Sequence, residues 1–241
     1  MSVKFLALEI RRVLRSPRFM IFTVAFPVLL FLLYVGIFAK AQDEKAVLMV
    51  SMTAFGAMAA ALFTGTRVAL ERAAGWQRQL RLTPLSGSGY LAAKAATGMT
   101  LALAPVVLVP AVGGLIEGVS LGGAGWVRVT LGVWLAAIPF ALMGLLIGQI
   151  GTADSTQPIT QLVLLPMALL GGVFIPVTAM PAWLLKIAHV LPTYWMGEIG
   201  RGAIPGGSAS TLSKDVLVLA VWTVVLSIAV IRRYRRDSAR V

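Results

Sequence analysis

The sequence predicts an all-α integral membrane protein with six transmembrane helices in a single domain, 1–241. Hydrophobic residues make up 59% of the chain and charged residues only 12%, an apolar surplus too large for one soluble core. Six apolar stretches each reach the length of about 20 residues that a helix needs to cross a bilayer. Almost every ionisable residue lies between these stretches or at their ends. We therefore expect lipid to be the main solvent of this chain.

The predicted spans are 19–39, 46–66, 91–116, 127–151, 157–177 and 211–231. Prolines fall inside or at the ends of several of them, where each proline removes a backbone donor and bends the helix. Small residues recur at a spacing of four at Ala57, Ala61 and Gly65, and again at Gly144 and Gly148. Such spacing allows close helix contact. We favour packing within the bundle over a homodimer seam as its explanation.

An amphipathic helix is predicted at 2–15, before the first span. Val3, Leu6 and Ile10 fall on one helical stripe, while most of the basic residues fall opposite. A helix of this kind lies in the membrane interface, held by apolar burial and by anionic headgroups, so membrane lipid is an expected partner. A merely basic N-terminal flank is the alternative.

Basic residues are divided unequally between the two sides that six spans create. Fifteen of the 21 Lys and Arg residues fall on the side of both termini and six on the other. This asymmetry satisfies the positive-inside rule and predicts a multi-pass plasma-membrane protein with both termini in the cytoplasm. The loop around Asp154 carries no Lys or Arg, so parity alone orients the fourth and fifth spans. Because topology accounts for the net charge of +12, no nucleic acid is expected as a partner.

The chemistry that the sequence lacks narrows the function. Cysteine is absent and His189 is the single histidine, so we expect no metal site, no catalytic residue and no enzyme activity. No Asp, Glu, Lys or Arg lies near the middle of a span, which disfavours an ion-coupled carrier. No lysine follows a glycine, so the chain has no phosphate-binding loop and no cofactor of its own is expected. If the protein pumps, it must use a separate ATPase.

The segment 70–84 is predicted to be one short cytoplasmic helix that ends at Pro84. Ala73, Trp76 and Leu80 share one face with arginines on either side, so an apolar knob with a basic rim points away from the bundle. A Trp in such a position is typical of an interface anchor. From the residues alone, an ordinary basic loop with Trp76 at the lipid headgroups explains the pattern equally well.

The region after the fifth span, 178–205, is predicted to dip back into the outer leaflet. Gly171, Gly172 and Pro176 cannot continue a regular helix, so the fifth span should break near its outer end. Apolar residues then follow at helical spacing from Trp183 onward, with aromatic residues suited to the interface. We favour this re-entrant form over a long outside loop with one amphipathic helix.

Together these segments resemble the permease subunit of type-2 ABC transporters, particularly the small drug-efflux branch. The resemblance covers essentially the whole chain and rests on the order of individually weak motifs: Glu71-Arg72, Gly75, Trp76, Leu80, Thr83-Pro84, Gly172, Phe174, Pro176, Pro181, Trp183, Leu191-Pro192 and Arg201. It implies that 70–84 is the coupling helix that docks on an ATPase subunit through Glu71, Arg72, Gly75, Trp76, Leu80 and Pro84. One departure is Trp76, where a smaller residue is common in the family.

The resemblance also implies that 171–204 forms an outer hairpin that caps the path between two permease subunits. The corresponding residues are Gly171, Gly172, Phe174, Pro176, Pro181, Trp183, Pro192 and Trp195.

The implied function is the transmembrane half of an ATP-driven exporter. Two ATPase subunits would bind ATP and Mg, and a second permease, identical or related, would complete the path. The expected path is a surface between bundles lined by small residues, and the expected cargo is a hydrophobic or amphipathic drug or natural product. Export of lipid or lipid-linked glycan is the alternative within this class. A non-transporting membrane anchor or signalling partner is the alternative from another class.

Overall fold

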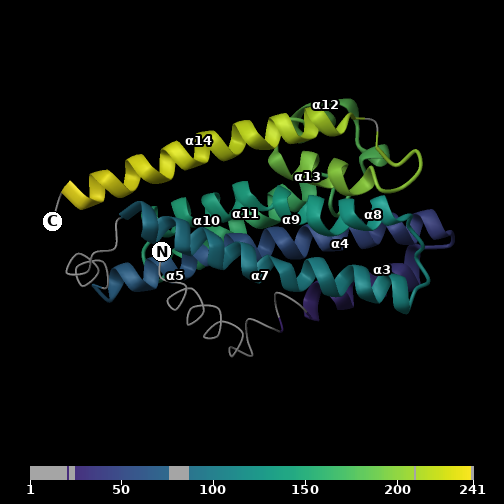
Figure 1. Cartoon of the computed structure of the whole chain (residues 1–241), viewed down its shortest axis with the longest axis horizontal. Coiled ribbons are helices and arrows are strands. Elements are labelled where there is room, and N and C mark those ends of the chain that lie inside the picture. Colours follow the sequence, from purple (N-terminus) through teal and green to yellow (C-terminus); the bar gives the residue numbers. More distant parts are fainter. Residues whose placement is uncertain (1–20, 22–24, 76–86, 209, 240–241) are drawn as a thin grey trace.

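A computed structural model describes residues 21, 25–75, 87–208 and 210–239, and this part of the chain forms helices and no strand (Figure 1). The all-α class is therefore confirmed. In chain order the helical elements are α3 (Phe26–Phe38), α4 (Gln42–Leu62), α5 (Thr64–Ala73), α7 (Gly87–Leu115), α8 (Gly123–Val127), η2 (Arg128–Gly132), α9 (Val133–Ala136), α10 (Ile138–Ile150), α11 (Thr156–Leu170), η3 (Val177–Ala179), α12 (Ala182–Ala188), α13 (Pro192–Arg201) and α14 (Leu212–Ala239).

Apolar helices account for all six predicted spans, but not all at full length. Among the described residues, four helical segments are long and apolar enough to cross a membrane: Gln42–Ala73, Gly89–Leu115, Gly123–Ile150 and Leu212–Arg236. Two shorter apolar helices, Phe26–Phe38 and Thr156–Leu170, accompany them.

The helices surround α4 and leave α14 at one edge of the bundle (Figure 1). In their most apolar windows, 83% of the residues of Gln42–Ala73 are buried, against 22% of those of α14. We call one end of the bundle the α5 end, where α5, α10 and α14 finish and α7 begins. The opposite end, which holds the start of α4 together with α12 and α13, is the α13 end.

The second span extends further than its predicted range, 46–66. It runs from Gln42 to Ala73, so residues 70–73 complete this long helix and do not begin the separate helix predicted at 70–84. The helix ends here because Gly75 adopts a φ of 69°, the left-handed conformation that stops an α-helix. The remainder of 70–84 from residue 76 onward, the predicted helix 2–15 and the beginning of the span 19–39 lie outside the described residues.

The fifth span, predicted at 157–177, ends earlier, at Leu170. A Cβ on Gly171 would lie 2.3 Å from the hydroxyl oxygen of Thr193, and Gly172 has a φ of 81°. The two glycines therefore let the chain leave the helix and pass close to α13. The predicted break is confirmed, and the span is shorter than predicted because the break comes at the first glycine.

The fourth span, predicted at 127–151, begins at Gly123 and is not uniform. Arg128–Gly132 forms a π-helix, a wide turn that is rare and occurs frequently at functional sites. The helix is interrupted again at Ala137, where Pro139 occupies the first turn of α10. The sixth span, predicted at 211–231, continues as helix to Ala239.

Candidate functional site

At the α5 end, Glu71 joins three helices. Its Oε2 accepts a hydrogen bond from the hydroxyl of Tyr90 at 2.8 Å, and its Oε1 pairs with Nζ of Lys94. Lys94 is only 1% exposed, so the carboxylate compensates a charge that burial alone would make costly. The ring of Tyr90 lies 6.3 Å from that of Tyr234. Glu71 on α5 is thus bound to α7 and, through Tyr90, packed towards α14.

The next residue, Arg72, reaches a different helix. Its Nη1 donates hydrogen bonds to the carbonyl oxygens of Gly148 at 3.1 Å, of Gly151 at 3.4 Å and of Gln149. These carbonyls lie at the C-terminal end of α10, where helical partners run out and the helix dipole is negative. A guanidinium there satisfies the carbonyls and the dipole together. Two consecutive side chains therefore bind the last turn of α5 to both α7 and α10.

Glycines bring α5 and α10 into backbone contact. A Cβ on Gly65 would lie 2.0 Å from the carbonyl oxygen of Gly144, and one on Gly148 would lie 2.2 Å from that of Gly65. Packing within the bundle, our interpretation of these small residues, is confirmed. Ala57 and Ala61 are completely buried as well. These small residues therefore line a contact inside the chain and not a surface between bundles.

The structure describes three of the six predicted ATPase-contacting residues. Glu71 and Arg72 are engaged by helices of their own chain, and Gly75 ends the long helix. The other three, Trp76, Leu80 and Pro84, lie outside the described residues. Glu71 and Arg72 thus fix the point from which the segment 76–84 departs.

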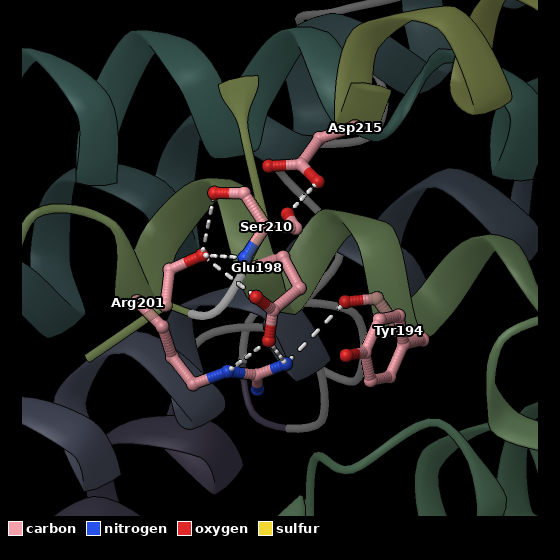
Figure 2. Close-up of polar contacts among 6 residues, drawn as sticks. Tyr194, Glu198, Arg201, Ser210 and Asp215 are labelled. Atoms are coloured by element: carbon pink, nitrogen blue, oxygen red, sulfur yellow. Dashed lines mark hydrogen bonds and ion pairs between the residues drawn. The ribbon is translucent and has the colours of Figure 1, made fainter. Parts of the chain in front are cut away.

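We call residues 171–208, which include the predicted outer hairpin, the hairpin or outer segment. At the α13 end, a buried ion pair shapes this hairpin (Figure 2). Nε and Nη2 of Arg201 donate to Oε1 of Glu198 at 3.0 and 2.7 Å, and the hydroxyl of Ser208 donates to Oε2 of Glu198 at 2.7 Å. Glu198 is 2% exposed and Arg201 5%. The guanidinium also lies 5.8 Å from the ring centre of Tyr194. All four residues belong to α13 or to the loop after it, so the pair holds the hairpin to itself.

Two further charged residues connect this hairpin with its neighbours. Asp215, in the first turn of α14, is fully buried, and its Oδ1 accepts a hydrogen bond from the hydroxyl of Ser210 (Figure 2). The N-terminus of α14 stabilises a negative charge at this position. Arg128, the first residue of the π-helix, donates from Nη1 to the carbonyl oxygen of Gly202 at 2.5 Å. The fourth span is thereby attached to the end of α13.

The prolines predicted in the outer segment begin its helical turns. Pro181 is the N-cap residue of α12, Pro192 is the first residue of α13, and Pro176 precedes the short turn η3. Proline suits these positions because its missing N–H would have no helical partner there.

The aromatic residues of the outer segment have different environments. The ring of Phe174 lies 5.0 Å from that of Phe55 on α4. Trp195 donates from Nε1 to the carbonyl oxygen of His189 at 2.8 Å, whereas Trp183 on α12 is 65% exposed. Phe174 therefore anchors the segment to the bundle, Trp195 joins α13 to the end of α12 within the segment, and Trp183 is exposed.

Sequence reasoning missed several residues of these clusters. It used Lys94 only as a marker of orientation and did not single out Tyr90, Glu198 or Asp215 as site residues. A usable signal was present, because Tyr90 and Lys94 are four residues apart and Glu198 and Arg201 three apart, spacings that share one helix face.

An apolar groove of about 510 Å³ opens at the α13 end between α7 and the segment α8–η2. Pro110, Gly114, Trp126 and Thr130 are among the residues that line it. Within the described ranges, no three His, Asp or Glu side chains gather in a way that could hold a metal ion. The groove could accommodate an apolar chain. The charged clusters around Glu71–Arg72 and around Glu198–Arg201 hold their helices in fixed positions.

The long apolar helices, with their charges gathered at the two ends, define a multi-pass α-helical membrane protein. Residues 5–204 match the sequence profile of the ABC-2 type transporter, and the chain belongs to that family. It is therefore a permease subunit, typically the non-catalytic transmembrane component, and the family implies an ABC ATPase subunit as its partner.

Two named relatives are permeases as well. Over 219 residues the chain is 27% identical to the transport permease YvfS of Bacillus subtilis (strain 168), and the match covers 89% of each protein. Over 87 residues it is 34% identical to the inner membrane transport permease YadH of Escherichia coli (strain K12), covering 33% of this chain and 34% of YadH. Neither name states what is transported.

Proposed function

We propose that this chain is the membrane-spanning half of an ATP-driven exporter that moves a hydrophobic or amphipathic molecule, such as a drug or natural product, out of the cell. Family membership supports a permease that works with an ABC ATPase. The apolar composition of the helices supports an apolar cargo, because a charged cargo would need compensating groups along its route.

The working assembly consists of two permeases, identical or related, and two ATPase subunits, which bind ATP and Mg. All six apolar helices cross the plasma membrane, with both termini in the cytoplasm. The distribution of basic residues supports this orientation, because Arg72, Lys94 and the arginines of α14 gather at the α5 end. The α13 end then faces outward.

The segment 70–84 is the coupling element of this exporter. Its part beyond Gly75 meets the ATPase, and its first turn passes the movement to the bundle. Glu71 and Arg72 support this role because they bind that turn to α7 and α10 at once. A displacement of 76–84 therefore acts on two helices, and the bundles rock between states of access.

The outer segment closes the path at the α13 end. Gly171 and Gly172 end α11 and turn the chain towards α13, and the Glu198–Arg201 pair keeps the hairpin in one shape. A hairpin held together by a buried ion pair can move as a unit.

The observation that carries the proposal is the double attachment of the last turn of α5, directly before Gly75. The test is to replace Arg72 or Trp76 by Ala in the complex reconstituted with its ATPase and to measure transport-stimulated ATP hydrolysis. We expect a loss of stimulation in both variants. Lys186→Ala, an exposed change at the opposite end, is the matched control.

Full coupling in both variants would reject this role for 70–84. The wider proposal is tested separately. An ATPase subunit should copurify with the chain, whereas a membrane anchor need not bring one along. Uphill flux by the chain alone, in vesicles without any ATPase, would contradict an exporter driven by a separate motor.

A further inference from the structure

The last helix, α14, exposes one continuous apolar stripe to the surroundings. The residues on this stripe recur at steps of three and four and are 41 to 64% exposed: Leu217, Val221, Val224, Val225, Ile228 and Ile231. Leu219, Leu226 and Val230 lie on the opposite face and are 2 to 6% exposed. In a multi-pass membrane protein, the exposed stripe contacts the acyl chains of lipids.

Arginines follow on the same face of the helix, directly after the apolar stripe. Arg232 follows Ile228 by four residues, Arg235 follows Ile231 by four, and both arginines are exposed. Tyr234 instead turns towards the bundle, with its ring 6.3 Å from that of Tyr90. The helix therefore presents Arg232 and Arg235 on the side that faces lipid.

The length of α14 sets the depth of these arginines. From Val216 to Ile231 no charged residue interrupts the helix, a distance of about 24 Å at 1.5 Å per residue. The hydrocarbon of a bilayer is about 30 Å thick, so a helix anchored at Lys214 and Asp215 brings Arg232 and Arg235 to the opposite headgroup layer. Exposed guanidinium groups at this level meet phosphate, which a planar bidentate donor binds well.

We infer that Arg232 and Arg235, together with the exposed Arg236, form a binding site for the headgroup of an anionic phospholipid, whose acyl chains lie along the stripe above them. A lipid fits better than an acidic protein because the arginines share a face with the lipid-exposed Ile228 and Ile231. The inference does not depend on the exporter function.

The test is native mass spectrometry of the full-length chain in detergent, titrated with phosphatidylglycerol and, in parallel, with phosphatidylcholine. We expect the unchanged chain to prefer phosphatidylglycerol. Arg232→Gln with Arg235→Gln should weaken the first bound phosphatidylglycerol by about tenfold, because each basic residue near a membrane surface adds to the attraction. Arg232→Lys with Arg235→Lys keeps both charges and should retain most of the binding.

A matched control removes two exposed positive charges from the other end of the molecule, through Lys40→Gln with Lys186→Gln. An equal loss of phosphatidylglycerol in this control would reduce the effect to net charge and overturn the site. Full competition by glycerophosphoglycerol, which has no acyl chains, would overturn the role of the stripe. If the glutamine variant keeps the lipid but loses a copurifying ATPase, the arginines bind protein and the inference fails.

Discussion

The Glu71–Lys94 pair and the Glu198–Arg201 pair, at opposite ends of the bundle, connect the helices in opposite ways. At the α5 end, Glu71 and Arg72 connect different helices, because one binds Lys94 on α7 and the other binds the carbonyls of α10. At the α13 end, Glu198 and Arg201 pair within a single helix. In the proposed exporter, the first arrangement would transmit a displacement between helices, whereas the second would preserve the shape of one hairpin. Whether a charge pair connects two helices or stabilises one therefore depends on which helices carry its two residues, more than on how strong the pair is.

The largest effect is expected from the glycine contact on which the α5 end rests. Gly65→Val would place a Cβ 2.0 Å from a backbone oxygen that cannot move aside, and overpacking of this kind costs about 3 kcal/mol or more. Thermal unfolding in detergent measures the loss. Gly36→Val is the control, because a Cβ there meets nothing within 4 Å. Equal stability of both variants would show that backbone contact does not hold α5 in place.

An effect of comparable size is expected from the hairpin. Glu198→Ala leaves the guanidinium of Arg201 buried without its carboxylate, and breaking a buried pair in this way costs about 3 to 5 kcal/mol. The same unfolding measurement applies. ATP consumed per molecule transported should stay constant in the protein that remains folded. If Glu198→Ala changed the ATP consumed per molecule transported but left stability unchanged, the Glu198–Arg201 pair would act in coupling and not in holding the hairpin's shape.

A smaller, functional effect is expected from Lys94→Met. Met fills the apolar volume but cannot bind Glu71, so α5 loses its ion pair with α7 while the hydrogen bond from Tyr90 stays. A coupling change of about 2-fold to 30-fold is expected from residues of this kind. Transport per ATP hydrolysed is the measurement. Exchanging the charges, with Glu71→Lys and Lys94→Glu, should restore part of the coupling. No change in this ratio for Lys94→Met would remove the Glu71–Lys94 ion pair from the coupling route.

The smallest effect is expected from an ion pair that is partly exposed. Lys45 and Glu117 lie 3.0 Å apart at the α13 end, with side chains 25% and 20% exposed. Glu117→Gln should cost at most about 1 kcal/mol, because water screens such pairs. A cost as large as that of Glu198→Ala would mean that the difference in burial does not explain how much each ion pair contributes to stability.

The helical fold follows from composition and periodicity, because lipid imposes length and apolarity on every span. The ends of the spans do not follow as directly. Gly75 and Gly171 end their helices through backbone geometry and close contacts with distant residues, and only the folded chain shows which glycine in a run acts. The π-helix at Arg128–Gly132 has no comparable signal in the sequence.

The sequence predicts where the candidate site lies, but not which residues its side chains contact. The segment 70–84 and the paired glycines before the outer hairpin stand out by residue type. The partners of Glu71 and Arg72 lie 19 to 79 residues away in the chain, so no local pattern reveals them. The contacts of Trp76 with an ATPase stay a prediction.

The deep burial of α4 constrains where cargo can travel. Its most apolar stretch is enclosed by other helices of the same chain, and Gly144 lets α10 press directly against the end of α4 at Leu62. An exporter built from this chain would have to part that seam to open a channel within one subunit. A translocation path along an exposed surface of the bundle would leave this seam closed. A second subunit would then have to form the other side of that path.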